Sequence, residues 1–208
     1  MIVIKKKNTQ KNQIYNKCLK FSKNVEINNS KFIDPAVIGQ NTKINNSFLK
    51  KYFICGENNE ITNSDFGSYC SLGNNITTNA GKHPLKWIST HLFQVNKNAW
   101  SWYEKYSHDK NNKNVNFSWK TRNLFGNDVW IGNNAVILTG LKIADGCVIG
   151  ANSLVNIDLP PYSIVQGVPC KIIRYRFKKS IINELLKLSW WNKSDKEISE
   201  INFKKYID

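Results

Sequence analysis

Hydrophobic residues recur at every sixth position through the middle of the chain. The uninterrupted run comprises Phe125, Ile131, Ile137, Ile143, Ile149 and Val155. An α-helix repeats its apolar face every 3.6 residues and a half-buried strand every second residue, so a sustained period of six fits neither element alone. The pattern instead predicts short strands joined by turns, with one inward side chain on each strand.

The residues beside each member of the run support this interpretation. Two positions earlier stands a small or aliphatic residue, and the next position is often Gly or Asn, residues that tolerate the positive φ of a tight corner. Three six-residue sides would close one coil of eighteen residues. Successive coils would then stack at the inter-strand spacing of about 4.8 Å around an aliphatic core.

An earlier stretch shows the same spacing less cleanly. The period of six holds within two groups of residues: Phe32, Ile38 and Ile44, then Phe66 and Leu72. Between these groups, around residues 48–54, the frame slips. We interpret the slip as one bulged or irregular coil of the same prism, because the Asn and Gly residues at the corners continue through it.

The repeat stops from Gly81 to Asn123, a segment rich in aromatic residues. So long an interruption of a compact repeat is typical of a functional loop. After the repeat ends at Pro160-Pro161, helical spacing over residues 181–188 and a capping box at Ser194–Glu197 predict two short helices. We expect an N-terminal strand and irregular coil over residues 1–30, a β-helix domain over residues 31–174 with a loop excursion over residues 81–123, and a C-terminal helical segment over residues 175–208.

Composition narrows the class of protein. No stretch approaches the 18 apolar residues that a membrane span needs, so we expect a cytoplasmic protein without a membrane span. The five cysteines are dispersed and lack CxxC pairing, which disfavours a disulfide framework or a zinc knuckle. Cys70 and Cys147 fall on inward positions and are expected to be buried.

The formal net charge of +15 raises the question of nucleic-acid binding. The lysines are scattered rather than gathered on one helix or groove, and they accompany many asparagines, which indicates a compositional bias. We therefore expect no nucleic-acid partner. A positive field would still favour an anionic ligand such as coenzyme A or a charged glycan.

Several segments resemble a known family. They are Gly126–Gly132, Ile149–Val155, Pro160–Lys171 and Gly81-Lys82-His83-Pro84. Together they are similar to the hexapeptide-repeat acyltransferases, and within them to the xenobiotic acetyltransferase branch, which includes the hexapeptide-type chloramphenicol acetyltransferases. The resemblance implies an all-β fold, a left-handed parallel β-helix with a long protruding loop and short C-terminal helices. It also implies a homotrimer with an acetyl-coenzyme A cleft between neighbouring subunits.

Acetyl transfer to an alcohol needs a base for the hydroxyl proton, and histidine suits this task near neutral pH. The three histidines, His83, His91 and His108, all lie in the loop. Residue types alone leave an ordinary surface histidine equally open for His83. The resemblance implies that His83 is the general base.

The resemblance also implies the cofactor contacts. Asn133 and Ala151, one eighteen-residue coil apart, would hold the pantetheine arm. Asn156 and the residue after it occupy the positions of a Thr-Lys pair in the family. This departure from the family pattern removes one cation. Lys171 and Arg174 would meet the nucleotide phosphates of acetyl-CoA. Plain turn residues and solvated cations remain the alternatives at these positions, and no metal is expected.

Aromatic residues of the loop are candidates for acceptor binding. Trp87, Trp100, Trp102 and Tyr103 would suit a sugar or a drug-sized molecule, and the alternative for each is packing.

Three function classes follow. We favour an O-acetyltransferase acting on a hydroxyl of a saccharide or other small acceptor, with an antibiotic such as chloramphenicol or a streptogramin as the alternative acceptor. A metal-dependent β-helix enzyme would need histidines on the prism walls, where the repeat has none. A non-catalytic scaffold or glycan-binding module remains the alternative of another class.

Overall fold

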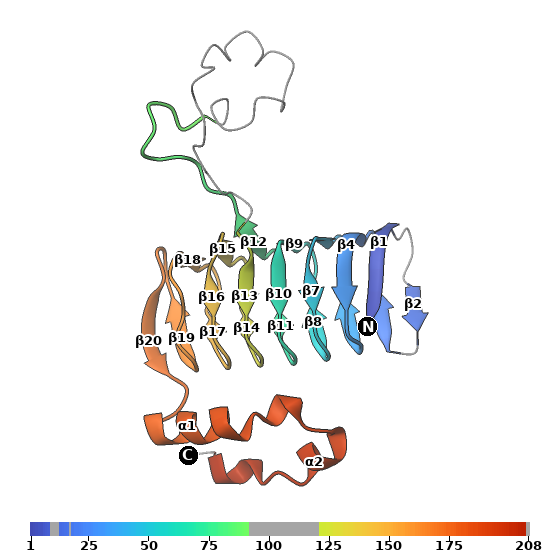
Figure 1. The fold of residues 1–208 in the computed structure, drawn as a ribbon, viewed down its shortest axis with the longest axis vertical. Helices are drawn as coiled ribbons and strands as arrows, with labels where there is room; N and C mark the ends of the chain where they lie inside the picture. The colour runs from blue at the N-terminus through green and yellow to red at the C-terminus, as the bar shows by residue number, and fades with distance from the viewer. Residues whose placement is uncertain (9–12, 17, 92–120, 207–208) are drawn as a thin grey trace, which may run out of the picture.

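The chain winds into a stack of coils, a parallel β-solenoid followed by short helices (Figure 1). The structure, a computed structural model, describes residues 1–8, 13–16, 18–91 and 121–206. Its strands pair coil to coil, each with the equivalent strand of the next coil. The predicted fold class, a β-helix with short C-terminal helices, is confirmed.

Each coil has three sides, and each side is a ladder of short parallel strands. Side 1 contains β6 (Lys43–Asn45), β9 (Glu60–Thr62), β12 (Thr77–Ala80), β15 (Val136–Leu138) and β18 (Leu154–Val155). Side 2 contains β7 (Phe48–Leu49), β10 (Ser64–Phe66), β13 (Asn123–Phe125) and β16 (Lys142–Ile143). Side 3 contains β5 (Ala36–Ile38), β8 (Phe53–Cys55), β11 (Ser71–Leu72), β14 (Trp130–Ile131), β17 (Val148–Ile149) and β19 (Ser163–Gln166).

Antiparallel strands close the two ends of the stack. At the N-terminal end β4 (Glu26–Phe32) runs along sides 1 and 2 and pairs with β1 (Ile2–Asn8), and β3 (Leu19–Phe21) pairs with β2 (Gln13–Asn16). At the other end β20 (Lys171–Tyr175) pairs with β19. Because β3 and β4 also pair in parallel with β5 and β6, parallel coil pairing already begins N-terminal of residue 31.

The core is the column of inward side chains that the spacing of six predicts. Every member of the run from Phe125 to Val155 is at most 5% exposed. Cys70 and Cys147 are fully buried, and none of the five cysteines, all of which lie in described parts of the chain, forms a disulfide bond. The aromatic members stack along the column, with the rings of Phe66 and Phe125 4.1 Å apart.

Corners of the solenoid are built from residues with left-handed backbone. At corner A, between sides 3 and 1, these are Asn24, Asn41, Asn58, Asn75, Asn134 and Asn152. At corner B, between sides 1 and 2, they are Asn29, Asn46, Asn63, Asn79 and Gly140. At corner C, between sides 2 and 3, they are Tyr52, Tyr69, Asp128, Gly146 and Tyr162. Asparagine tolerates this region better than most residues, so part of the asparagine content has a structural cause.

Coil length changes across the excursion, and this corrects the prediction of one irregular coil. Ile44 pairs with Ile61 after 17 residues, whereas Ile131 pairs with Ile149 after 18. The missing residue falls at corner B of every coil before the excursion, so the slip around residues 48–54 is a regular feature. Buried serines close the tighter corner: the Ser47 N–H donates to the Ser30 hydroxyl at 3.1 Å, and the Ser64 N–H donates to the Ser47 hydroxyl at 3.2 Å.

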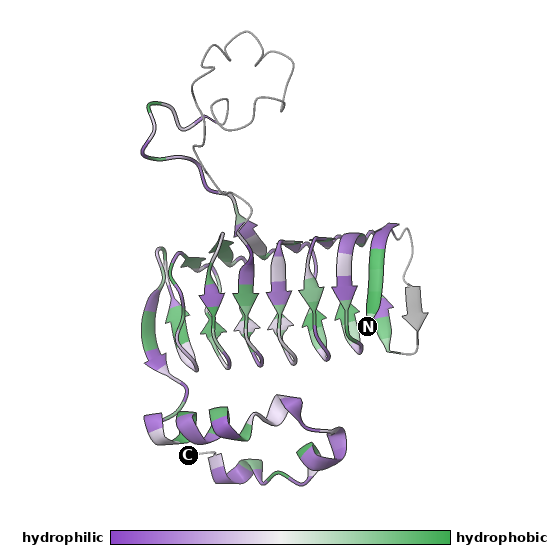
Figure 2. Cartoon of the chain, viewed as in Figure 1, coloured by the Kyte–Doolittle hydropathy of each residue, from purple (hydrophilic) through white to green (hydrophobic). Residues whose placement is uncertain are grey.

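The C-terminal helices lie along corner C, at the opposite edge of the solenoid from the departing excursion (Figure 1). They are α1 (Lys179–Leu188), η3 (Trp190–Asn192), α2 (Asp195–Ser199) and η4 (Phe203–Tyr206). Hydrophobic and hydrophilic residues alternate along α1 (Figure 2). The predicted capping box at Ser194 and Glu197 is present, and Trp191 is 4% exposed. None of the helices in the described residues is long and apolar enough to cross a membrane.

Candidate active site

The excursion leaves and re-enters the solenoid at corner B. Its outgoing arm follows Ala80, whose carbonyl accepts from the Thr139 N–H at 3.2 Å. The returning arm is held by Asn79, whose Nδ2 donates to the Thr121 carbonyl at 2.6 Å. The two arms of the predicted functional loop are therefore fixed side by side on the wall of the solenoid.

A charged pair adds a second anchor to this stem. Arg122 donates from Nε to Asp65 Oδ2 at 3.0 Å and from its NH2 group to the other carboxylate oxygen. Both side chains are about one-third exposed, so solvent screens the attraction between their charges. The planar, two-point hydrogen bonding therefore contributes more to the strength of this contact than the charge attraction does. Sequence reasoning missed this pair, because its members are separated by the whole excursion.

His83 lies on the outgoing arm with its side chain exposed. Its Nδ1 is 2.8 Å from the backbone carbonyl oxygen of Thr90, seven residues later. A carbonyl oxygen only accepts hydrogen bonds, so Nδ1 carries the proton of the neutral ring and Nε2 keeps its lone pair. Pro84, next to His83, is buried. The arrangement orients the imidazole and leaves Nε2 as its basic nitrogen.

The other loop candidates are only partly described. Trp87 is half-buried, and its backbone N–H donates to the Pro84 carbonyl at 3.3 Å, which closes a turn beside His83. His91 is exposed, and its N–H donates to the Ser89 hydroxyl at 3.1 Å. The remaining candidates lie outside the described residues: Trp100, Trp102, Tyr103 and His108.

Asn133 and Ala151 lie on adjacent coils at corner A, as their spacing predicts. Both are exposed, and the N–H of Asn152 donates to the Asn133 carbonyl at 2.8 Å. The coils are in close contact here, since a Cβ added to Gly132 would lie 2.6 Å from the Ala151 nitrogen. The Asn133 side-chain oxygen accepts from the Asn74 N–H at 2.8 Å, so its Nδ2 is the group left to face a ligand.

The basic candidates lie at the C-terminal end of the stack. Lys171 is in register with Gln166 and Arg174 with Ile164 on the β19–β20 hairpin, and both cations are exposed. Asn156 is exposed just after β18. The Cys170 N–H donates to the Leu154 carbonyl at 2.9 Å, which places the turn before Lys171 against β18.

Within one chain the base and the candidate cofactor residues stand at different corners. His83 departs from corner B, whereas Asn133 and Ala151 are at corner A, across side 1. The strands of side 1 are two to four residues long, roughly 7–13 Å of extended chain. The described residues of a single chain do not bring the two sets into contact.

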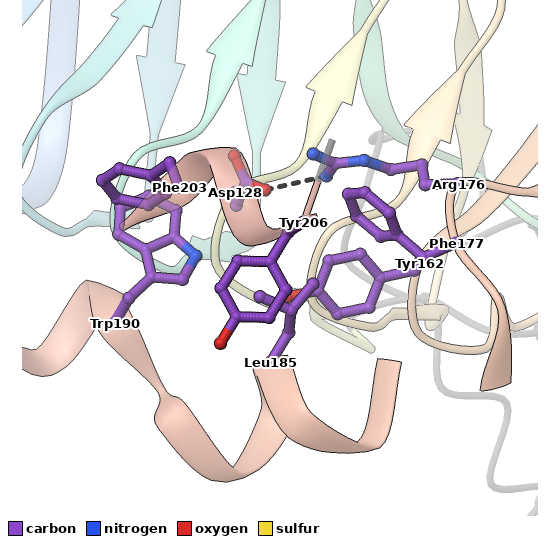
Figure 3. Close-up of a pocket in the computed structure, with 8 residues that line it drawn as sticks. All are labelled: Asp128, Tyr162, Arg176, Phe177, Leu185, Trp190, Phe203 and Tyr206. Carbon is purple, nitrogen blue, oxygen red and sulfur yellow. Dashed lines mark hydrogen bonds and ion pairs between the residues drawn. The ribbon is translucent and has the colours of Figure 1, made fainter. Parts of the chain in front are cut away.

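Corner C carries a further polar group that the sequence did not reveal. The guanidinium of Arg176 donates to Asp128 at 2.8 Å and to the Gly146 carbonyl at 2.9 Å, and lies over the Tyr162 ring (Figure 3). Burial raises the pKa of Asp128 and of Tyr162, and Arg176 opposes this effect at both. These residues line a pocket of about 250 Å³ under the C-terminal helices, away from the excursion. The group ties three coils to the strand that leads into α1.

No cluster of three or more potential metal ligands occurs among residues 1–8, 13–16, 18–91 and 121–206.

Comparisons with known proteins agree with this architecture. Residues 125–156 match the family model of the bacterial transferase hexapeptide, six repeats. A chloramphenicol acetyltransferase from Morganella morganii is 52% identical over 67 residues, 32% of each chain. A probable macrolide acetyltransferase from Lysinibacillus sphaericus is 38% identical over 126 residues, 61% of this chain and 66% of that protein. A galactoside O-acetyltransferase from Escherichia coli K12 is 53% identical over 49 residues, 24% of each chain.

The matched segments thus span from about a quarter to 66% of these relatives. They confirm the resemblance to hexapeptide-repeat acetyltransferases, including those that act on chloramphenicol.

Proposed function

We propose that this chain, which carries the bacterial transferase hexapeptide over residues 125–156, transfers an acetyl group from acetyl-CoA to a hydroxyl of a saccharide or other small acceptor. The observation that carries the proposal is the hydrogen bond between His83 Nδ1 and the Thr90 carbonyl, which leaves Nε2 available as a base. The acetyltransferase names of the relatives support the reaction class.

The proposed chemistry is direct transfer within a ternary complex. His83 Nε2 takes the proton of the acceptor hydroxyl as its oxygen attacks the carbonyl carbon of the thioester. The bond between that carbon and sulfur then breaks, and coenzyme A leaves as the thiol after taking up a proton. Proton transfer of this kind contributes about 10²–10⁴-fold to rate.

The exposed groups at corner A fit the donor substrate. Asn133 Nδ2 and the backbone at Ala151 are polar groups on a narrow edge, suited to the amides of a pantetheine arm. Lys171 and Arg174 lie beyond them as exposed cations, and the net charge of +15 favours an anionic ligand. Asn156 completes this set beside β18.

The acceptor would lie next to His83, and Trp87 is the described aromatic residue nearest to it in the chain. Trp100, Trp102 and Tyr103 remain candidates for the same role. A galactoside O-acetyltransferase among the relatives supports a saccharide. The identities of 52% to a chloramphenicol and 38% to a macrolide acetyltransferase favour the second candidate function, acetylation of an antibiotic.

We further propose a homotrimer with the active site between two copies. A cleft of this kind would place corner A of one copy beside the excursion of the next, and so join the base to the cofactor residues. Side 3 exposes apolar side chains that suit burial, with Ile54 52% and Trp130 57% exposed. Dependence on acetyl-CoA is consistent with a cytoplasmic enzyme.

The proposal is tested by thiol release from acetyl-CoA against a panel of nucleotide sugars, free glycans, chloramphenicol and virginiamycin. Release with a saccharide supports the first candidate, and release with an antibiotic alone supports the second. Absence of release with every acceptor, together with absence of coenzyme A binding by calorimetry, supports a non-catalytic scaffold instead.

A further inference from the structure

A groove runs along side 2 at corner B, on the coils before the excursion. Its volume is about 430 Å³, and it is lined by Met1, Asn29, Lys31, Asn46, Ser47, Phe48, Asp65 and Arg122. Three of these side chains form one outward row, because Lys31 and Asp65 are both in register with Phe48. The half-buried Phe48 ring therefore lies between a cation and a carboxylate.

The edge of the groove carries amides with unused hydrogen-bonding capacity. Asn29 Nδ2 donates to Asn46 Oδ1 at 3.1 Å, and Asn46 Nδ2 donates to Asn63 Oδ1 at 2.6 Å. Each of these amide nitrogens has a second N–H, and each accepting oxygen has a second lone pair. Asn29 and Asn46 are exposed, so these groups face the groove and solvent. The hydrogen bonds between successive asparagine side chains fix their positions.

The far wall of the groove is also fixed. Asp65 accepts two hydrogen bonds from Arg122, so the pair is close to neutral while the carboxylate oxygens keep further lone pairs. Lys31 is exposed, and within the described part of the chain its ammonium has no partner. Fixed donors and acceptors therefore lie beside a single aromatic ring and the exposed ammonium of Lys31.

We propose that this groove binds a saccharide, a role separate from acetyl transfer at His83. The Phe48 ring is the apolar surface on which the C–H face of a sugar ring would pack. The Asn29 and Asn46 amides and the Asp65 carboxylate meet the hydroxyls, which both donate and accept. Lys31 favours a sugar with a carboxylate. A flat apolar ligand fits less well, because it would leave the amides and the charged groups desolvated without partners.

The placement connects the groove to the excursion. Arg122 follows Thr121, whose carbonyl is held by Asn79 at the stem. A sugar bound on Phe48 would therefore contact Arg122, at the base of the excursion that carries the proposed base His83.

Saturation-transfer NMR on the full chain with glucose, N-acetylglucosamine and glucuronate tests the proposal without acetyl-CoA. We expect transfer to the sugar ring protons, with binding weakened about tenfold in Phe48→Ala and unchanged in Leu124→Ala. Leu124 is the matched control, because it is 44% exposed and next in register to Asp65 in the same outward row. Lys31→Gln should weaken glucuronate alone.

The His83→Ala variant separates this proposal from the proposed catalysis. Its saturation transfer should equal that of the wild type even though acetyl transfer is lost. Absence of transfer to all three sugars, or equal binding by wild type and a folded Phe48→Ala variant, would overturn the saccharide groove. Circular dichroism of each variant establishes that it is folded.

Discussion

The Nδ1 atom of His83 lies 2.8 Å from the backbone carbonyl oxygen of Thr90. This contact sets both the direction of the ring and its tautomer, since the carbonyl has no proton to give. It also identifies the group that orients the candidate base. The contact uses a main-chain atom, so no residue type at position 90 signals it.

The tautomer is the first prediction. In wild-type protein with ¹⁵N-labelled histidine, we expect the Nδ1 of His83 to give a protonated, pyrrole-like signal and Nε2 a pyridine-like one. The ring of His91 serves as an internal comparison within the same spectrum, and the His83→Gln variant assigns the signals. A pyridine-like Nδ1 at His83 would contradict the proposed orientation.

Gly146 provides the second prediction. Its φ is +70°, and an added Cβ would lie 2.5 Å from the Tyr162 ring. We expect Gly146→Ala to destabilise the protein by about 2 kcal/mol or more, from the left-handed backbone and the clash. The melting temperature should fall by roughly 4–8 °C.

Gly81→Ala is the matched control for this substitution. An added Cβ at Gly81 meets nothing within 4 Å, so its melting temperature should equal that of the wild type. Equal melting temperatures for both variants would mean that corner C is not packed as described.

The fold was largely predictable because its signal is periodic. The spacing of six from Phe125 to Val155 predicted inward positions that are all buried. The 17-residue coils were missed, because the shorter step from Ile44 to Leu49 resembles an irregularity unless it is compared across several coils. The buried serines that hydrogen-bond at this corner form only a weak repeat in the sequence.

The site was less predictable because its partners are distant in the chain. His83, Asn133 and Ala151 were assigned from motifs, and those roles stay proposals. The Arg122–Asp65 and Arg176–Asp128 pairs join residues 57 and 48 positions apart. No local pattern predicts such pairs, since they depend on which coil follows which.

The C-terminal helices give the third prediction, a pH dependence. Tyr52 donates to Asp195 at 2.7 Å, and this hydrogen bond raises the pKa of Tyr52 to about 12 from an ordinary value of 10. A raised pKa means that the folded state favours the protonated phenol. Its stabilising contribution is complete below pH 10 and is lost as the pH rises through about 12.

Ultraviolet titration of tyrosine ionisation measures this effect. Tyr52→Phe should remove one phenol that titrates near pH 12, and Asp195→Asn should move that phenol toward its ordinary pKa of 10. Identical curves for wild type and Asp195→Asn would show that the helices do not dock on corner C through this pair.

The proposed trimer gives the fourth prediction. Trp130 is 57% exposed on side 3, so Trp130→Glu should bring a charge into the interface and convert trimers to monomers. Light scattering coupled to size exclusion measures the mass. Leu124→Glu, at an exposed apolar position on side 2, is the control and should remain trimeric. A wild-type protein that is monomeric would contradict the proposal of a site between copies.

The most direct test of the proposed catalysis compares acetyl transfer and coenzyme A binding in His83→Ala. With an acceptor identified from the panel, we expect kcat to fall by about 100-fold or more while the Kd for coenzyme A stays at the wild-type value. Lys86→Ala, an exposed substitution on the same arm, should retain wild-type kcat. Wild-type kcat in His83→Ala would contradict the assignment of His83 as the general base.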